Sequence, residues 1–294
     1  MSAVEEHLAT RRSAGLFDFS FMGLYEFADA ASLQALQTRD LQAMKPGQIA
    51  YTLLLKQDGA VLIDATVWCL SSRQFWLFTG RRSAYGGRDR SDEYAILALQ
   101  GPSSGWILAR VIGPDAVGSL RHFHFLEKDG VIVARLGFTG ELGYELLAPA
   151  GAAAALRAKL LELGGNEGLR ECGWAAADSL RIEAGYVLFD REVDGRANPR
   201  ELGLERLAPG MKFDIARRLV GLEILDEPAS GDLPGVEVTS ECFSPTLGKA
   251  LALGLADPSA SVGNAVRLPD GRSARVCALP FYDPERRRPR RAPL

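Results

Sequence analysis

The sequence predicts an α+β protein that ends in a small all-β domain, and two observations point to this class. Helical stretches rich in alanine and leucine occur among apolar strands through residue 205. From about residue 219 the chain instead shows short strands, with turn residues roughly every ten positions, which is typical of a small all-β barrel or sandwich. The sequence contains no G-x-G-x-x-G or Walker loop, so nothing in it indicates a nucleotide-binding loop.

The first elements follow from helix caps and apolar patterns. Residues 3–15 predict a helix with Gly15 as its C-terminal cap, and residues 16–27 predict one strand. Asp29 is expected to open a helix over residues 29–44. Residues 50–78 predict two or three strands, with a hairpin turn at Asp58 and Gly59.

The following elements lead to a domain boundary. A charged loop is expected over 81–94, strands over 95–101 and 123–138, and helices over 102–113, 151–165 and 173–185. In the last helix Asp178 and Arg181 are three residues apart and can form an ordinary surface ion pair. We place the boundary near residue 206, with a β-barrel domain over 206–280. Residues 281–294 combine prolines with charges and predict a basic, disordered tail.

Composition restricts the possible partners. The chain has 294 residues and a net charge of -3, which gives no general attraction to nucleic acid or to an anionic membrane. No apolar run approaches the roughly 20 residues of a membrane span, and we expect a cytoplasmic protein. The four cysteines are far apart, and His122 and His124 lack a third ligand nearby, so neither a disulfide nor a metal site is expected.

Asp64 is the first candidate for chemistry. All of its neighbours within three positions are apolar or threonine, which predicts that its carboxylate lies in a core or in a lined pocket. Burial of an unpaired carboxylate is costly and raises its pKa. Asp64 could therefore orient or protonate an amine, or it could be a strand-end residue that accepts backbone N–H bonds.

Glu145 is the second candidate. It follows the glycine-rich stretch 137–143 and lies in a strand between Tyr144 and Leu146. A carboxylate in this position can accept two parallel N–H bonds from one planar partner. Either an arginine or the 2-amino-4-oxo edge of a heterocycle offers such a pair, and the local sequence does not decide between them.

Several ordered motifs resemble one family. "GLFDFSFMG" resembles its "G-M-F-D-V-S-H-M-G", and "LGFTGELGYEL" resembles its "x-G-Y-T-G-E-x-G-F-E-x". "ADSLRIEAGYVLFDREVD" and "VTSECFSPTLGKALALGLA" match two later blocks, "R-D-x-L-R-L-E-A-G-x-x-L-Y-G-x-D-x-D" and "I-T-S-G-x-F-S-P-T-L-G-x-x-I-A-L-A". The chain thus resembles the aminomethyltransferase, or T-protein, of the glycine cleavage system and its folate-dependent demethylase relatives.

This resemblance implies a fold and a cofactor. The fold would be a three-domain cloverleaf around a channel for tetrahydrofolate, in which residues 1–205 form two intertwined α+β subdomains with a break near 80–95. Asp64 would be the catalytic acid beside the reacting nitrogens of the cofactor, and Glu145 would bind the N3–H and 2-amino group of the pterin. The glycines before Glu145 would let the backbone approach the pterin. The other cofactor-binding positions implied are Met22, Tyr51, Thr66, Trp68, Phe138, Leu147 and Tyr186.

Three residues depart from the family pattern, and these differences affect which partners are expected. Phe21 replaces a histidine, Thr79 an asparagine and Ala177 an arginine that contacts the cofactor in the family. The expected activity is transfer of a methyl or aminomethyl-type carbon from a small-molecule donor to tetrahydrofolate, and a lipoyl carrier protein is not expected as a partner. The alternative is a non-catalytic folate-binding regulator or scaffold of the same fold.

Overall fold

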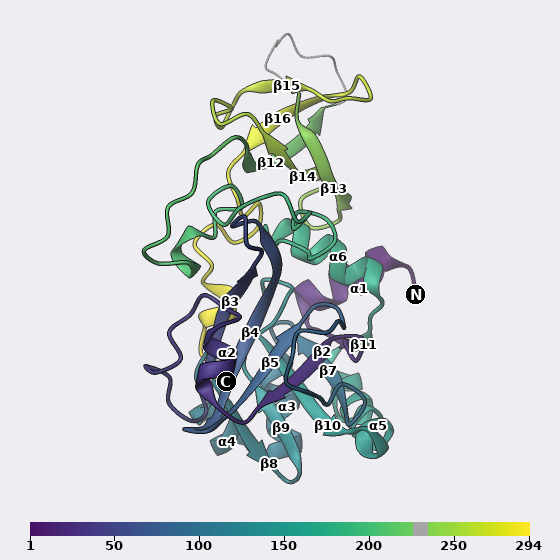
Figure 1. Ribbon diagram of the computed structural model, residues 1–294. Helices are drawn as coiled ribbons and strands as arrows, with labels where there is room; N and C mark the ends of the chain where they lie inside the picture. The colour runs from purple at the N-terminus through teal and green to yellow at the C-terminus, as the bar shows by residue number, and fades with distance from the viewer. Residues whose placement is uncertain (226–234) are drawn as a thin grey trace.

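The structure is a computed structural model that describes residues 1–225 and 235–294. In this part of the chain the strands form three sheets, and helices pack against each of them, which confirms the α+β class. The three sheets correspond to the three lobes of the cloverleaf, and the C-terminal sheet lies above the other two in Figure 1. No helix in the described residues is long and apolar enough to cross a membrane.

The first lobe is a six-stranded sheet in the order β11-β1-β7-β10-β9-β8. Helices α3, α4 and α5 cover one face of it, and apolar side chains from these helices and from alternate strand positions form one core. The elements are β1 (Ala14–Asp18), β7 (Tyr94–Gln100), α3 (Ser104–Ile112), α4 (Pro114–Ser119), β8 (Phe125–Lys128), β9 (Val131–Ala134), β10 (Gly143–Pro149), η1 (Ala150–Ala152), α5 (Ala153–Gly164), η2 (Gly165–Glu167) and β11 (Leu169–Glu171).

The second lobe is a five-stranded antiparallel sheet in the order β3-β4-β5-β2-β6. Gly59 adopts a left-handed φ of 86° in the hairpin between β3 and β4, as the Asp58-Gly59 pair predicts. Asp29 caps the short helix α2 by accepting the backbone N–H of Ser32. The elements are β2 (Gly23–Phe27), α2 (Ala30–Gln34), β3 (Ile49–Leu55), β4 (Val61–Ser71), β5 (Gln74–Thr79) and β6 (Arg88–Asp89).

The N-terminal segment differs from the predicted single strand over 16–27. It forms two strands in different sheets, because the chain turns at residues 19–22, where Ser20 accepts the backbone N–H of Ile96. Helix α1 (Ala3–Arg12) ends at Ser13, and Gly15 lies in β1 instead of capping the helix. A Cβ at Gly15 would come within 2.3 Å of the Thr10 hydroxyl, so glycine allows the strand to pass close to the helix.

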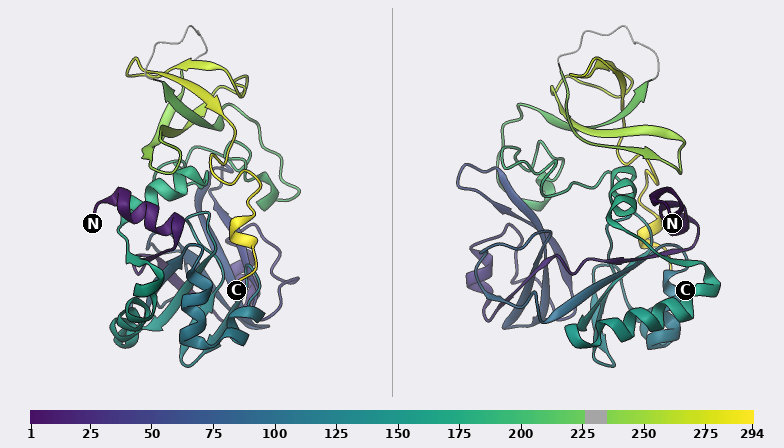
Figure 2. Two further views of the ribbon diagram at one scale, coloured as in Figure 1. Left: turned by 180° about the vertical axis from the view of Figure 1, so that it is seen from behind. Right: turned by 90° about the vertical axis from the view of Figure 1, so that its right-hand side faces the viewer.

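The third lobe is a five-stranded antiparallel sheet in the order β13-β14-β12-β16-β15. It packs against helix α6, as the two views of Figure 2 show. Its core consists of apolar side chains from all five strands. Its strands are β12 (Arg218–Leu225), β13 (Glu237–Ser244), β14 (Lys249–Ala256), β15 (Ala265–Arg267) and β16 (Ser273–Cys277); the remaining elements of the chain are α6 (Trp174–Glu183), η3 (Glu205–Leu207) and η4 (Arg288–Arg290).

Arg181 joins α6 to the third lobe. The prediction of an ordinary surface pair is wrong, because Arg181 is completely buried, although its Nε does donate to Asp178 at 2.7 Å. Its other nitrogens donate to Glu192 at 2.7 Å and to Ser240 of β13 at 2.7 Å, and Ser240 donates to Glu192. The charge of Arg181 is thus neutralised inside the interface between lobes.

We therefore expect Ser240→Ala to destabilise the protein by about 1–3 kcal/mol, because it leaves a donor of Arg181 unpaired in the interior and removes one of the two hydroxyl donors to Glu192 Oε1. Urea unfolding measures the change in free energy. The exposed Ser72→Ala is the matched control and should have little effect. Equal stability of the two variants would show that the buried hydroxyl contributes nothing.

The C-terminal segment differs from the predicted disordered tail. It runs down from the third lobe along the first, drawn in yellow in Figures 1 and 2, and includes the short helix η4. Tyr282 donates to the buried Glu141 at 2.9 Å, Arg135 donates to the carbonyl of Arg291, and Arg291 donates to the carbonyl of Pro102. These partners are more than 100 positions away in the sequence, so the local composition did not reveal them.

Candidate functional site

Two predicted acids face the same space between the first two sheets. Residues on alternate positions of a strand share one face. Glu145 on β10 shares its face with Leu147, and Asp64 on β4 shares its face with Thr66 and Trp68. Leu147 and Trp68 belong to one apolar cluster between the sheets, so both carboxylates point toward this region from opposite sides.

Asp64 is held by a tyrosine. The hydroxyl of Tyr51, on the neighbouring strand β3, donates to Asp64 Oδ2 at 2.9 Å. The Asp64 side chain lies deep among protein atoms but keeps part of its surface accessible. Burial raises its pKa, which the hydrogen bond from Tyr51 opposes. Asp64 is in the interior of β4, so the strand-end alternative does not apply.

Glu145 has no partner. It is 5% exposed and makes no hydrogen bond or ion pair with any residue of 1–225 or 235–294, so no arginine in this part of the chain accounts for it. Its cross-strand neighbours are Ala98 and Ala134, which are small and apolar. Burial raises the pKa of the Glu145 carboxyl to about 7. An unpaired buried carboxyl is costly in a protein without a ligand, and two donors from a ligand would remove that cost.

This pKa predicts a pH dependence of stability. The ordinary value of 4.5 applies to the unfolded chain, so between pH 4.5 and about 7 the folded form holds a proton that the unfolded form has lost. The free energy of unfolding should therefore fall as pH rises through this range, by at most about 1.4 kcal/mol per pH unit. Urea unfolding of wild type and Glu145→Gln across this range measures the difference. If that difference stays constant with pH, burial does not raise the pKa.

The other predicted cofactor residues fall into two groups. Tyr51, Thr66, Met22, Phe138 and Tyr186 are partly exposed, and the rings of Phe138 and Tyr186 stack with centroids 6.1 Å apart. Trp68 and Leu147 are completely buried and offer no surface to a ligand. The indole of Trp68 packs against Phe78 and Phe125 and donates to the hydroxyl of Thr66 at 3.0 Å. Trp68 therefore orients the Thr66 hydroxyl but is not itself open to a ligand.

The glycines before Glu145 leave room for neighbouring side chains to pack against the backbone. A Cβ at Gly137 or Gly143 would come within 1.9 or 2.3 Å of the Gln100 side chain, which fills the space between them. Gly140 has a φ of 78°, and a Cβ there would meet Ala184 at 2.8 Å. In this structure the glycines thus admit Gln100 and α6, which differs from the expected approach to a pterin.

The positions that depart from the family pattern lie in different surroundings. Ala177 is completely buried in α6 and belongs to the cluster between the sheets. Phe21 is 44% exposed and packs edge-on against Trp174 at 5.4 Å. The buried hydroxyl of Thr79 donates to the carbonyl of Arg81. None of these three side chains carries a charge that could bind a carboxylate.

Comparison with known families shows which family this chain belongs to. The family model described as "GCVT N-terminal domain" matches residues 1–209, and "Glycine cleavage T-protein C-terminal barrel domain" matches residues 217–283. The chain belongs to the glycine cleavage T-protein family. The resemblance seen in its motifs is thereby confirmed, and the T-protein fold places β12 to β16 in the C-terminal barrel domain.

Individual relatives of this T-protein family agree. The aminomethyltransferase of Symbiobacterium thermophilum is 34% identical, with 98% of this chain and 91% of that protein covered. The aminomethyltransferase of Halothermothrix orenii is 33% identical, with 90% and 88% covered. Among solved structures, the glycine cleavage system aminomethyltransferase T from Bartonella henselae superposes with a TM-score of 0.80 at 26% identity, covering 96% of this chain and 90% of that one.

The sequence alone does not identify two residues that lie near Tyr186 and Asp64. The guanidinium of Arg286 lies over the ring of Tyr186, and the negative charge of Glu192 contributes to the raised pKa of Asp64. Arg286 lies in the segment predicted to be disordered, and the local sequence gives no signal for its contact with Tyr186. Glu192 gave no signal, because its approach to Asp64 requires the contact between α6 and the third lobe.

Proposed function

We propose that this protein transfers a one-carbon group, of the methyl or aminomethyl type, from a small-molecule donor to tetrahydrofolate. The carbon would reach a nitrogen of the folate beside Asp64. The observation that carries the proposal is the partnerless carboxylate of Glu145, set among alanines on a strand of the first sheet. Membership of the T-protein family and the aminomethyltransferase names of its relatives support it.

The chain's residues fit a pterin. The pterin edge presents a ring N–H beside an amino group, and a carboxylate accepts two such parallel donors. Glu145 is the group that would accept them, while the stacked rings of Phe138 and Tyr186 offer an aromatic surface for the remainder of the ligand. Tyr51, Thr66 and Met22 would complete the contacts from the second lobe.

Asp64 would hold the reacting amine or transfer a proton to it. Tetrahydrofolate, when bound, supplies the nitrogen that accepts the carbon. Because burial raises its pKa, Asp64 can exchange a proton with an amine more readily near neutral pH than an exposed aspartate can. Tyr51 fixes the orientation of the Asp64 carboxyl through its hydroxyl, so that one oxygen remains free for the substrates.

The direct test is to incubate the protein with tetrahydrofolate and with candidate N-, O- and S-methyl donors, and to measure one-carbon derivatives of the folate. We expect one donor class to be used. A thermal shift gives an independent reading, since tetrahydrofolate at 100 times its dissociation constant should add about 2.7 kcal/mol of stability. Absence of any stabilisation would refute folate binding, whereas stabilisation without transfer to any donor would favour the regulator or scaffold.

A further inference from the structure

A buried arginine of the first lobe has no acidic partner. Arg135 directly follows β9 and is only 5% exposed, and it makes no ion pair with any residue of 1–225 or 235–294. Its guanidinium donates to two backbone carbonyls, that of Leu120 at 3.0 Å and that of Arg291, while its buried Nε has no partner in this part of the chain. A buried charge without a counter-charge is costly, so Arg135 is suited to a negatively charged ligand.

Arg135 lies on the face of the first sheet that is turned away from Glu145. Glu145 and Ala134 are cross-strand neighbours, so Tyr144 and Arg135 follow them in register on the opposite face. Tyr144 accordingly belongs to the core beneath α3, α4 and α5, whereas Ala134 belongs to the cluster between the sheets. The Tyr144 hydroxyl is buried and, among the described residues, has no hydrogen-bond partner. Two unpartnered donors therefore share one face of the sheet.

His122, Arg290 and Arg291 add basic groups to the same place. The ring of His122 is half-buried and makes no hydrogen bond within the described part of the chain. Burial, together with the charges of Arg135 and Arg290, lowers the pKa of His122 to about 4. The charge of Arg291 acts on the Tyr144 hydroxyl. No described carboxylate is among the groups that shift the pKa values of these side chains, so the five residues form a basic group, the Arg135 cluster.

The C-terminal segment covers the Arg135 cluster. Arg291 donates to the carbonyl of Pro102. A Cβ at Gly105 of α3 would meet the carbonyl oxygen of Pro293 at 1.8 Å and the Tyr144 hydroxyl at 3.3 Å, so the end of the chain lies against the helix above Tyr144. Figure 2 shows the end of the chain beside the helices of the first lobe. Such a cover restricts a ligand at the cluster to a small ion.

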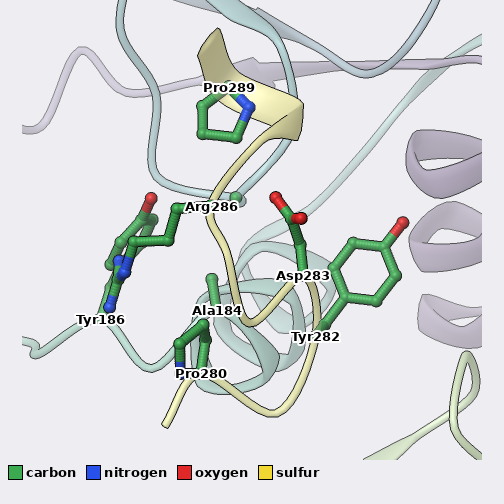
Figure 3. Close-up of a pocket in the computed structure, with 8 residues that line it drawn as sticks. Ala184, Tyr186, Pro280, Tyr282, Asp283, Arg286 and Pro289 are labelled. Atoms are coloured by element: carbon green, nitrogen blue, oxygen red, sulfur yellow. The ribbon is translucent and has the colours of Figure 1, made fainter. Parts of the chain in front are cut away.

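This place is separate from the region assigned to folate. Figure 3 shows the part of the C-terminal segment that passes a small hollow beside Tyr186, with Tyr282 and Pro289 among the residues that line it. Arg135 and Tyr144 do not line this hollow. An ion held at the cluster leaves the hollow and the space between the sheets free, so the inference does not rest on the proposed function.

We propose that the Arg135 cluster binds a small oxyanion of the phosphate type. The Nε of Arg135, the Tyr144 hydroxyl and the ring of His122 are donors that lack acceptors, and such an ion carries several acceptor oxygens with a negative charge. The ion would also offset the repulsion between Arg135 and the arginines at 290 and 291. It would thereby hold the C-terminal segment against the first lobe.

The test is calorimetry of the full-length protein with inorganic phosphate, at an ionic strength kept constant with chloride. Wild type should bind phosphate, and Arg135→Gln should bind it at least about tenfold more weakly, because hydrogen bonds to a charged group are lost. Arg290→Gln changes an exposed position and should weaken binding severalfold without disturbing the interior. The exposed Arg287→Gln is the matched control and should bind phosphate as wild type does.

Tyr144→Phe gives a second reading that does not depend on a change of charge. Without phosphate the variant should melt no lower than wild type, since it loses a buried hydroxyl that has no partner in the described residues. Saturating phosphate should then raise the Tm of wild type more than that of Tyr144→Phe. Methyl phosphate distinguishes the source of the ligand: binding of both probes assigns the site to a phosphoryl group of a small molecule, and binding of phosphate alone assigns it to the free ion.

Other outcomes would overturn the assignment. Phosphate that neither releases heat nor raises the Tm of wild type beyond the effect of chloride excludes the site. Equal affinity of wild type, Arg135→Gln and Arg290→Gln places the ion elsewhere on the protein. Equal weakening by Arg287→Gln shows a general attraction to basic residues, which is an adventitious ion only. A lower Tm of Tyr144→Phe without phosphate assigns its hydroxyl a structural role and removes it from the site.

Discussion

Asp64→Asn is expected to leave tetrahydrofolate binding largely intact and to slow turnover by about 10²–10⁴-fold. Asparagine keeps the size of the side chain and can still accept the hydrogen bond from Tyr51, but it cannot exchange a proton with the substrate amine. The measurement is the turnover number with saturating folate and donor, together with the dissociation constant for folate from calorimetry.

The exposed Asp40→Asn is the matched control for this substitution and should keep full activity. Turnover of Asp64→Asn within a factor of a few of wild type would contradict proton transfer by Asp64. A large loss of folate affinity, with unchanged turnover at saturation, would make Asp64 a binding residue only.

Glu145→Ala is expected to weaken tetrahydrofolate binding by about 10²–10⁴-fold, because two charge-assisted hydrogen bonds to the pterin edge are lost. The variant should be at least as stable as wild type at neutral pH without ligand, since it removes an unpaired buried carboxyl. Calorimetry measures the affinity, and urea unfolding measures the stability.

Glu127→Ala, an exposed position on β8, is the matched control and should bind folate normally. If Glu145→Ala is strongly destabilised without ligand, the carboxyl has a structural role. If the variant binds folate as wild type does, the pterin is recognised by other groups and the central assignment fails.

The sequence predicts those features of the site that depend on strand alternation. Apolar neighbours placed Asp64 and Glu145 inside the protein, and the structure has both carboxylates facing the cluster between the sheets. The family resemblance added the three-lobed fold, which the comparisons confirm. The roles of the individual site residues remain predictions.

Features that depend on distant partners could not be predicted. Arg181 looked like a surface residue, because its helix pattern says nothing about Glu192 and Ser240, which bury it. Residues 16–27 looked like one strand, because the local pattern cannot show that the chain changes sheets there. The C-terminal segment looked disordered because Glu141 and Arg135, which hold it, lie far away in the sequence.

The position of β1 has a consequence for dissecting the protein. This strand lies between β11 and β7 in the first sheet, while the strand that follows it in the chain belongs to the second. A fragment that starts at Tyr94 would lack an inner strand and expose two unpaired edges, a known route to aggregation. The first lobe can therefore be produced alone only if residues 14–18 are reattached, for example by circular permutation.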